Sequence, residues 1–373
     1  MRRSALLFAL SLGAFGGALS ACSPAEQPSA PSGGLSTTKS AAPLVPAIVS
    51  AVGSALASAS AKPIDAPLVE KPPSISFEEA VDITFPTGLS ADAERCKSEA
   101  AKEADPKDER AADGAKIRCL IRARFSGDDA ARDMALGLYD KLGMVTGVAR
   151  DQVMDGGWRG EIHLVPELPV GQYRKHLQWV KSGFEDIDAF FAGLDEKRAP
   201  GTKATYRYRA LSLRFLRSVG RTTPSAYAQD WEVSYNVSGS LHASADAVRE
   251  TLFHEVFHTN DARHGRWSVS ALTATVDSIL EKCGQNTGCL TPYAPGTTMV
   301  RGGTYYAFQK GNGVGEYAAE LATRYFLEHQ AILAGKRYAK GTFKCGPAEN
   351  AKTWKALVDE FFGVDLTGDC PSP

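Results

Sequence analysis

The chain contains one pattern whose residue types and spacing are typical of a catalytic metal site, His254-Glu255-Val-Phe-His258. On an α-helix, residues four apart lie on the same face, so both imidazoles can bind one metal ion. Zinc suits this pair because it accepts neutral imidazole, and it lowers the pKa of a bound water to about 7. Glu255 is adjacent to the first histidine and does not ligate, so we expect it to be the general base that deprotonates this water.

The surrounding sequence predicts an amphipathic helix over residues 245–258, which we expect to stop near Asn260-Asp261 because both residues tolerate the left-handed conformation. Ser244 is the expected N-cap, and Asp246 lies where the helix macrodipole favours negative charge. The face away from the histidines is apolar, as expected of a helix that packs on one side. This face is formed by Val248, Leu252, Phe253, Val256 and Phe257.

Two residues compete to be the third zinc ligand that a catalytic site usually has beside its open position. Glu316 starts a predicted helix over residues 316–334 behind a glycine-rich turn, and its alanine-rich surroundings indicate close packing. Glu320 follows one turn later, where a carboxylate could orient a ligating imidazole from behind. His264 has the third-histidine spacing of the metzincins, although Asp261 replaces the usual glycine. The sequence favours Glu316 and leaves His264 as the alternative ligand.

These motifs resemble the gluzincin metallopeptidases, and most closely the catalytic domain of anthrax lethal factor and its relatives. The resemblance covers residues 245–330, and its stretches are His254–His258, Tyr305-Tyr306-Ala307 and Glu316-Tyr-Ala-Ala-Glu320. It implies a zincin-like α+β fold, with a small mixed sheet and an active-site helix followed by a mostly helical subdomain. It also implies that Glu316 is the third ligand, that Glu320 holds the first histidine, and that Tyr306 or Tyr305 stabilises the oxyanion.

The N-terminus resembles a bacterial lipoprotein signal over residues 1–21. Met1-Arg-Arg precedes a short apolar run that ends at Leu19-Ser-Ala-Cys22, where Cys22 is the residue expected to be lipidated. The run is too short and too rich in glycine for a transmembrane anchor. Since 42 basic residues balance 43 acidic ones, nothing indicates a nucleic-acid partner. The sequence predicts a lipid-anchored protein of the cell envelope or outer membrane that faces the periplasm or the exterior.

Residues 22–74 are rich in Ser, Ala and Pro and bury too little apolar surface to fold, so they predict a disordered tether. A zincin-like domain is expected over residues 75–373, with an N-terminal α+β part (75–245) and a zinc-site and helical part (246–373). Six cysteines remain, an even number that indicates three disulfides in an oxidising compartment. Among fifteen possible pairings, the nearest-neighbour set needs the fewest assumptions. It joins Cys96 to Cys119, Cys283 to Cys289, and Cys345 to Cys370.

Hydrophobic periodicity predicts the other elements of this mixed fold. Helices are predicted over residues 128–142, 172–194, 271–280 and 353–362, and strands over residues 160–168, 205–217 and 231–236. The strand over 205–217 reads as half-buried because its apolar residues alternate. The strand over 231–236 directly precedes the zinc helix and is the expected edge strand for an extended peptide. The chain has no glycine-rich phosphate loop, so nothing indicates nucleotide chemistry.

The sequence therefore predicts an exported zinc metallopeptidase that acts on a peptide or protein. One alternative is a catalytically inactive envelope protein that keeps a zincin scaffold for binding, and another is a zinc amidohydrolase that acts on cell-wall material. The intact Glu255 argues against the first alternative, because a domain used only for binding needs no general base. The motif itself is compatible with the second. Cleavage specificity and oligomeric state have no signal in the sequence.

Overall fold

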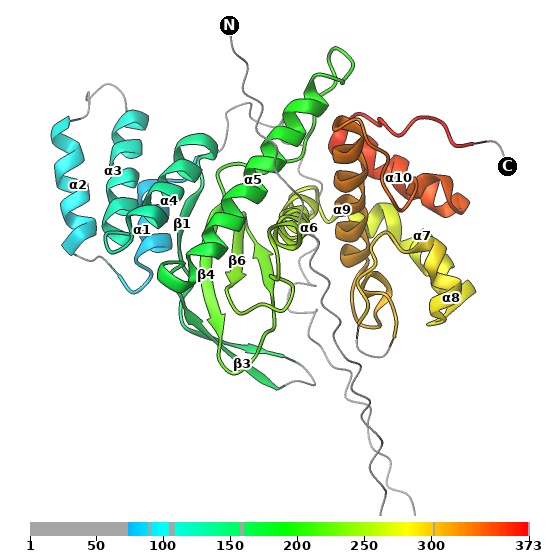
Figure 1. The fold of residues 1–373 in the computed structure, drawn as a ribbon, viewed down its shortest axis with the longest axis horizontal. Coiled ribbons are helices and arrows are strands. Elements are labelled where there is room, and N and C mark those ends of the chain that lie inside the picture. The colour runs from blue at the N-terminus through cyan, green and yellow to red at the C-terminus, as the bar shows by residue number, and fades with distance from the viewer. Residues whose placement is uncertain (1–73, 89–90, 104–108, 157–159, 301–302, 372–373) are drawn as a thin grey trace, which may run out of the picture. The chain divides into compact units, whose positions relative to one another are not determined.

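A computed structural model describes the protein over residues 74–88, 91–103, 109–156, 160–300 and 303–371. The expected signal peptide, Cys22 and nearly all of the expected tether lie outside these residues. The described chain is a mixture of helices and strands, which confirms the α+β class (Figure 1). In this part of the chain, no helix is both long enough and apolar enough to cross a membrane.

The described chain begins with helices that pack beside the sheet. They are α1 (Phe77–Thr84), α2 (Ala91–Glu103), α3 (Glu109–Arg124) and α4 (Asp129–Leu142). The predicted helix over 128–142 is confirmed as α4. Asp128 caps its first turn through a 3.1 Å hydrogen bond from the Ala131 amide, and Gly143 ends it in the left-handed conformation. The Cys96–Cys119 disulfide joins α2 to α3.

Six strands of the described chain form one mixed sheet in the order β2-β3-β4-β6-β5, with β1 also paired to β4. The strands are β1 (Val145–Val148), β2 (Gln152–Asp155), β3 (Glu161–Pro166), β4 (Ser212–Ser218), β5 (Ala226–Gln229) and β6 (Glu232–Asn236). β4 runs parallel to β1 and β6 and antiparallel to β3. It has partners along both of its edges and is the middle of the sheet.

Two strand predictions need correction. The predicted half-buried strand over 205–217 begins only at Ser212, and β4 is buried almost throughout. Both of its faces are covered, because Leu213 and Phe215 face the main core while Arg214 reaches the Asp82 carbonyl on α1. The strand over 231–236 forms as β6 but is not an edge strand, since it pairs with both β4 and β5. The edge position on that side of the sheet belongs to β5.

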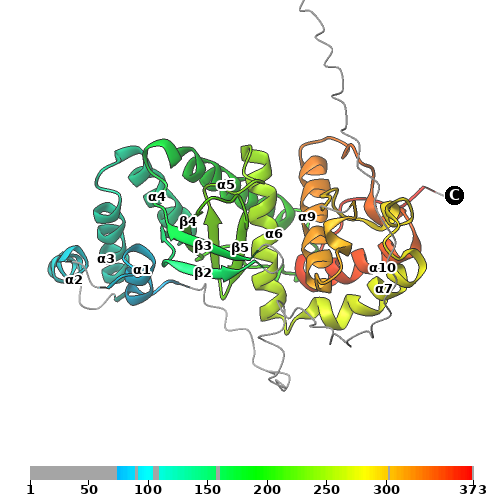
Figure 2. The same ribbon diagram turned by 90° about the horizontal axis from the view of Figure 1, so that it is seen from below.

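Two long helices connect the sheet to the C-terminal part of the chain. A single 3-10 turn, η2 (Gly171–Tyr173), leads into α5 (Arg174–Asp195), which confirms the predicted helix over 172–194. α5 packs against α6 (Ala245–Arg263). In Figure 2, α6 lies between the strands and the following helices, and it contacts β5, β6 and α9. The helix with the histidines is thus enclosed from both sides.

The C-terminal part is mostly helical in the described residues. Its elements are α7 (Trp267–Cys283), α8 (Thr287–Leu290), η3 (Thr291–Tyr293), η4 (Tyr306–Phe308), α9 (Val314–Leu333), η5 (Phe343–Cys345), α10 (Ala348–Leu357) and a π-helical turn, η6 (Val358–Phe362). Disulfides join Cys283 to Cys289 and Cys345 to Cys370. Together with Cys96–Cys119, they confirm the nearest-neighbour pairing.

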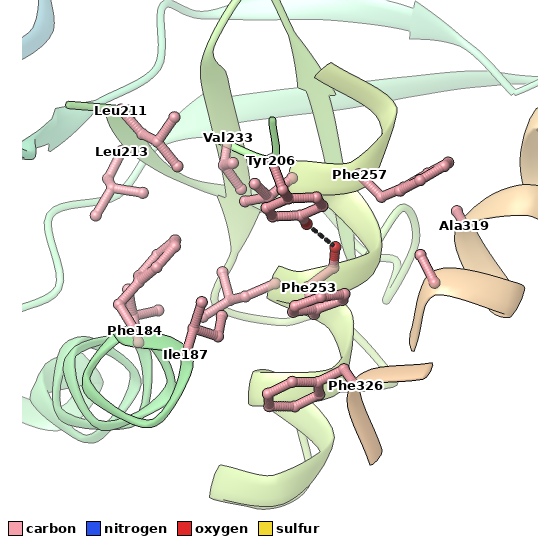
Figure 3. Packing of buried hydrophobic residues seen from close by; sticks show 14 of the residues in the cluster. Phe184, Ile187, Tyr206, Leu211, Leu213, Val233, Phe253, Phe257, Ala319 and Phe326 are labelled. Carbon is pink, nitrogen blue, oxygen red and sulfur yellow. Dashed lines mark hydrogen bonds between the residues drawn. The ribbon is translucent and has the colours of Figure 1, made fainter. Parts of the chain in front are cut away.

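An aromatic core holds α6 against both sides of the molecule (Figure 3). The Phe253 ring stacks on Tyr206 at 5.1 Å and on Phe326 of α9 at 4.5 Å between centroids. The Tyr206 hydroxyl donates a 3.1 Å hydrogen bond to the Phe253 carbonyl. Because Phe253 directly precedes the first histidine of the motif, this core sets the position of the side of α6 that carries the two histidines.

Candidate metal centre

The sequence around the histidines folds as a capped amphipathic helix. The Ser244 hydroxyl accepts a 3.2 Å hydrogen bond from the Ala247 amide, which confirms Ser244 as the N-cap. The five apolar residues of the predicted inner face are all buried. α6 does not stop after His258 but continues to Arg263, so that expectation is wrong. The Asn260 amide donates to the Val256 and Arg207 carbonyls, and these bonds hold it in the helix.

Helices α6 and α9 bring together three side-chain atoms that could bind a metal ion. The Nε2 atoms of His254 and His258 lie 3.1 Å apart on α6. The Oε2 atom of Glu316, in the first turn of α9, lies 3.1 Å from His254 Nε2 and 3.5 Å from His258 Nε2. Among the described residues, this is the group of His, Cys, Asp and Glu side chains whose ligand atoms are close enough to hold one metal ion.

The size of this triangle fits zinc. Tetrahedral zinc with bonds of about 2.0–2.1 Å places neighbouring ligand atoms about 3.3 Å apart. The observed separations of 3.1, 3.1 and 3.5 Å lie on either side of this value. Two imidazoles and one carboxylate also form a ligand set typical of catalytic zinc, with a fourth position left for water or substrate.

The electrostatics of the cluster favour a cation. Burial opposes protonation of His254, but the hydrogen bond to Glu316 and the charge of Glu255 outweigh it and raise the pKa of His254 to about 9. Burial likewise opposes ionisation of Glu316, yet both histidines hold the pKa of this carboxyl well below its usual range. The three side chains are therefore stable when a positive charge lies among them, carried either by a proton or by a metal ion.

Small side chains on α9 allow Glu316 to reach α6. Ala318, Ala319 and Ala322 are completely buried where α9 packs in the core, and Tyr317 beside them is buried too. α9 contacts α6 directly. Since an alanine side chain holds the backbones only slightly apart, the first turn of α9 can bring Glu316 within hydrogen-bond distance of both imidazoles.

Glu255 lies beside this triangle and is not one of its three members. It lines a cavity of about 420 Å³ together with His254, Tyr306 and Glu320. Burial raises the pKa of Glu255, and the neighbouring histidines oppose that shift only partly. The residue predicted to be the general base is thus placed at the cavity wall next to the candidate metal ligands.

The structure distinguishes Tyr306, the first residue of η4, from Tyr305, which precedes it. The Tyr306 ring lies 6.2 Å from the His254 ring, and the residue lines the cavity. Burial, and then the charges of Glu316 and Glu255, raise the pKa of Tyr306 well above its usual range, so its hydroxyl stays a hydrogen-bond donor. The Tyr305 hydroxyl lies 3.0 Å from the Thr291 hydroxyl. Of the two expected candidates, Tyr306 is therefore the one at the cluster.

Glu320 also reaches the cavity, one helical turn after Glu316. Its carboxylate packs against Gly296, where an added Cβ would lie 1.3 Å from Oε2. Burial raises the pKa of this carboxyl, and the neighbouring Thr298 side chain opposes that shift. Among the hydrogen bonds of the described residues, none joins Glu320 to His254, although the charge of Glu320 contributes to the raised pKa of that imidazole. The predicted role of Glu320, to orient the His254 imidazole from behind, thus stays a prediction.

His264, the alternative ligand, lies away from the triangle. It is the C-cap residue of α6, and its Nδ1 lies 2.6 Å from Glu360 Oε1. The Asp261 carboxylate accepts hydrogen bonds from the Ser268 amide and hydroxyl and so caps α7. Because α6 continues past His258 without a sharp turn, six residues carry the chain about 9 Å further along the axis. His264 is thus outside the described cluster.

Comparison with known proteins adds no assignment: no family model, curated protein or solved structure significantly matches the chain. The candidate centre is therefore supported by its residues and geometry alone.

The cavity also has walls that sequence reasoning did not anticipate. They come from the segment that enters β5, from the loop before α6, and from α9 and the loop after it. The residues include Pro224, Ala226, Leu241, Arg324, Tyr338 and Lys340. No spacing pattern marks them, since they meet only in the folded chain. Glu250 is the exception, because its position four residues before His254 places it on the same helix face.

Proposed function

We propose that the protein is a zinc-dependent peptidase with a zincin-like active site, in which His254, His258 and Glu316 hold the ion. The observation that carries this proposal is the triangle of two imidazole nitrogens and one carboxylate oxygen, with Glu255 beside it. When bound, zinc would supply Lewis acidity that polarises a carbonyl and makes water a better nucleophile.

The remaining chemistry belongs to side chains at the cavity wall. Glu255 accepts a proton from the attacking water and returns it to the nitrogen of the leaving amine. Tyr306 donates a hydrogen bond to the oxygen of the scissile carbonyl as negative charge develops there. Both residues line the cavity beside His254, which supports these roles.

The edge of the sheet supports a peptide as substrate. β5 pairs with β6 along one edge only, among the described strands, and Ala226 of β5 lines the cavity. An extended peptide can add to an open edge through main-chain hydrogen bonds. We propose that β5, in place of the predicted 231–236 strand, aligns the substrate along the cavity.

The proposed location is the bacterial cell envelope, with a lipid anchor at Cys22 and residues 22–74 as a tether. The three disulfides support an oxidising compartment. Nothing in the described geometry favours the two alternatives, an inactive binding protein or a cell-wall amidohydrolase.

Zinc content and hydrolysis of a peptide library test the proposal together. Glu255→Gln is expected to keep about one zinc per chain and to lose about 10²–10⁴-fold in activity, as is usual for loss of a proton-transfer group. Glu316→Ala is expected to abolish tight zinc binding, since two ligands hold zinc poorly, while His264→Ala is the matched control that retains it. The ligand assignment is wrong if His264→Ala empties the site and Glu316→Ala does not.

Glu320→Ala is expected to bind zinc about 10–100-fold more weakly if this carboxylate orients an imidazole from behind. Wild-type affinity in this variant would leave Glu320 as a residue of the cavity wall only. Circular dichroism of each variant checks that the fold is intact.

Loss of zinc in Glu255→Gln would make Glu255 a structural residue instead of a base, and unchanged hydrolysis would remove it from the mechanism.

A further inference from the structure

Glu250 places a carboxylate on the metal-facing side of α6. It lies four residues before His254 and eight before His258, so the three side chains share one stripe of the helix. Glu250 is half-buried and lines the same cavity as His254 and Glu255. Glu250 is not a member of the candidate ligand triangle and takes no part in the proposed proton transfer. Neither role therefore accounts for its carboxylate at the cavity wall.

The cation next to Glu250 in the sequence is already paired elsewhere. The Arg249 guanidinium lies 3.0 Å from the Asp186 carboxylate of α5 and 3.0 Å from the Asp246 carboxylate. Both contacts direct Arg249 toward the neighbouring helix and the first turn of α6. Its charge lowers the pKa of Glu250 from a distance but does not form a salt bridge with it.

The cations of the opposite wall also have other partners. Arg324 of α9 donates to the Glu328 carboxylate and to backbone carbonyls of the loop after α9. The Lys340 ammonium donates a 3.0 Å hydrogen bond to the Thr297 hydroxyl and is exposed to water. Within the described chain, no hydrogen bond or salt bridge reaches the Glu250 carboxylate.

A half-buried carboxylate without a partner is poorly solvated, and here burial raises the pKa of Glu250 despite the nearby positive charges. A cationic group that entered the cavity would restore the lost interaction. Such a group would form a charge-assisted hydrogen bond with the Glu250 carboxylate, and this bond would be stronger than at the surface because less water competes for the carboxylate in the cavity.

We infer that Glu250 recognises a cationic group of the substrate beside the scissile bond, an inference that rests on the proposed peptidase function. One helical turn rises about 5.4 Å and an extended peptide advances about 3.3 Å per residue, so the cation lies within about two residues of that bond. Two groups share this chemistry, the side chain of Lys or Arg and the free amino terminus of a short peptide.

Matched peptides test this inference on the zinc-loaded full chain. One set replaces Lys by norleucine at each position within two residues of the cleaved bond, and the other compares free with acetylated amino termini. We expect wild type to show about 10–100-fold higher kcat/KM on the cationic member of one set. In Glu250→Gln this ratio is expected to fall below about threefold, and Glu250→Lys is expected to favour acidic residues at the same position.

Asp246→Asn is the matched control, because it removes one negative charge from the same helix outside the cavity, and it should retain the wild-type ratio. Zinc content and melting temperature of each variant exclude loss of the metal or the fold. If kcat/KM depends on acetylation of the amino terminus and not on the Lys-to-norleucine change, the amino terminus is the recognised group. Three results would each overturn the inference: wild type shows no preference for the cationic peptide, Glu250→Gln keeps that preference, or Asp246→Asn loses it as fully as Glu250→Gln does. In each case, cleavage of any peptide still supports the proposed peptidase function. If zinc-loaded wild type cleaves no peptide, the proposed function itself fails and the inference with it.

Discussion

Two buried histidines predict that the fold loses stability in mild acid. His176 and His242 are only 4% and 6% exposed, and both contact Tyr235. His176 Nδ1 lies 2.9 Å from the Tyr235 hydroxyl, and the His242 ring stacks on the Tyr235 ring at 3.9 Å. Burial lowers the pKa of each histidine to about 4, with a further contribution at His176 from the charge of Lys175.

The direction and size of the effect follow from linkage. In the unfolded chain these histidines titrate near pH 6.5, whereas in the fold they stay neutral until about pH 4. Between these values the unfolded chain binds more protons, so the free energy of unfolding decreases as the pH falls. The loss grows by about 1.4 kcal/mol for each pH unit below 6.5, and it reaches about 2 kcal/mol per histidine at pH 5.

Urea unfolding at pH 7 and pH 5 measures this loss. Wild type is compared with His176→Gln and His242→Gln, each of which should lose about 2 kcal/mol less than wild type between the two pH values. His163→Gln is measured alongside as the matched control, since it replaces an exposed histidine of β3. All these proteins keep the candidate metal centre, so acid release of a metal cancels in the differences. Equal pH dependence in wild type and in both buried-site variants would refute the reasoning.

Further predictions concern the site, the core and the anchor. Tyr306→Phe should lower kcat by about 10²–10³-fold with zinc retained, whereas Tyr305→Phe should match wild type; equal losses in a peptide assay would contradict the assignment. Phe253→Ala, which empties a completely buried position, should cost about 3–5 kcal/mol in urea unfolding, and a loss below 1 kcal/mol would mean that the core closes around the gap. Cys22→Ser should move the protein from the membrane fraction to the soluble fraction, and a variant that stays membrane-bound would argue against lipidation.

Local features of this protein could be predicted from the sequence because neighbouring residues determine them. The Ser244 cap, the apolar stripe of α6 and the i,i+4 spacing of His254 and His258 involve residues within a few positions of one another. The disulfides also follow chain proximity, since each joins neighbouring cysteines. The α+β class follows from the same local periodicities.

At other positions, tertiary contacts overruled the local preferences of the sequence. Asn260-Asp261 favour a helix end, yet Arg207 and Ser268 bind their side chains and the helix continues. The strand over 231–236 was expected at the sheet edge, but its position depends on pairing with β4 and β5, which alternation within one strand does not encode. Strand order is set by long-range packing, and a strand's own residues specify only which of its faces is buried.

The candidate site likewise combines features that the local sequence predicts with features that depend on tertiary packing. Two candidate ligand positions can be predicted from α6, but the third depends on how closely α9 packs, and so does the choice between Glu316 and His264. Tyr305 and Tyr306 are chemically identical neighbours, and the backbone of the η4 turn decides which of them faces the cavity. A sequence pattern can specify a helix face because its period is local. The meeting of side chains from α6, α9 and the β5 edge depends on the whole core, and only the tertiary structure determines it.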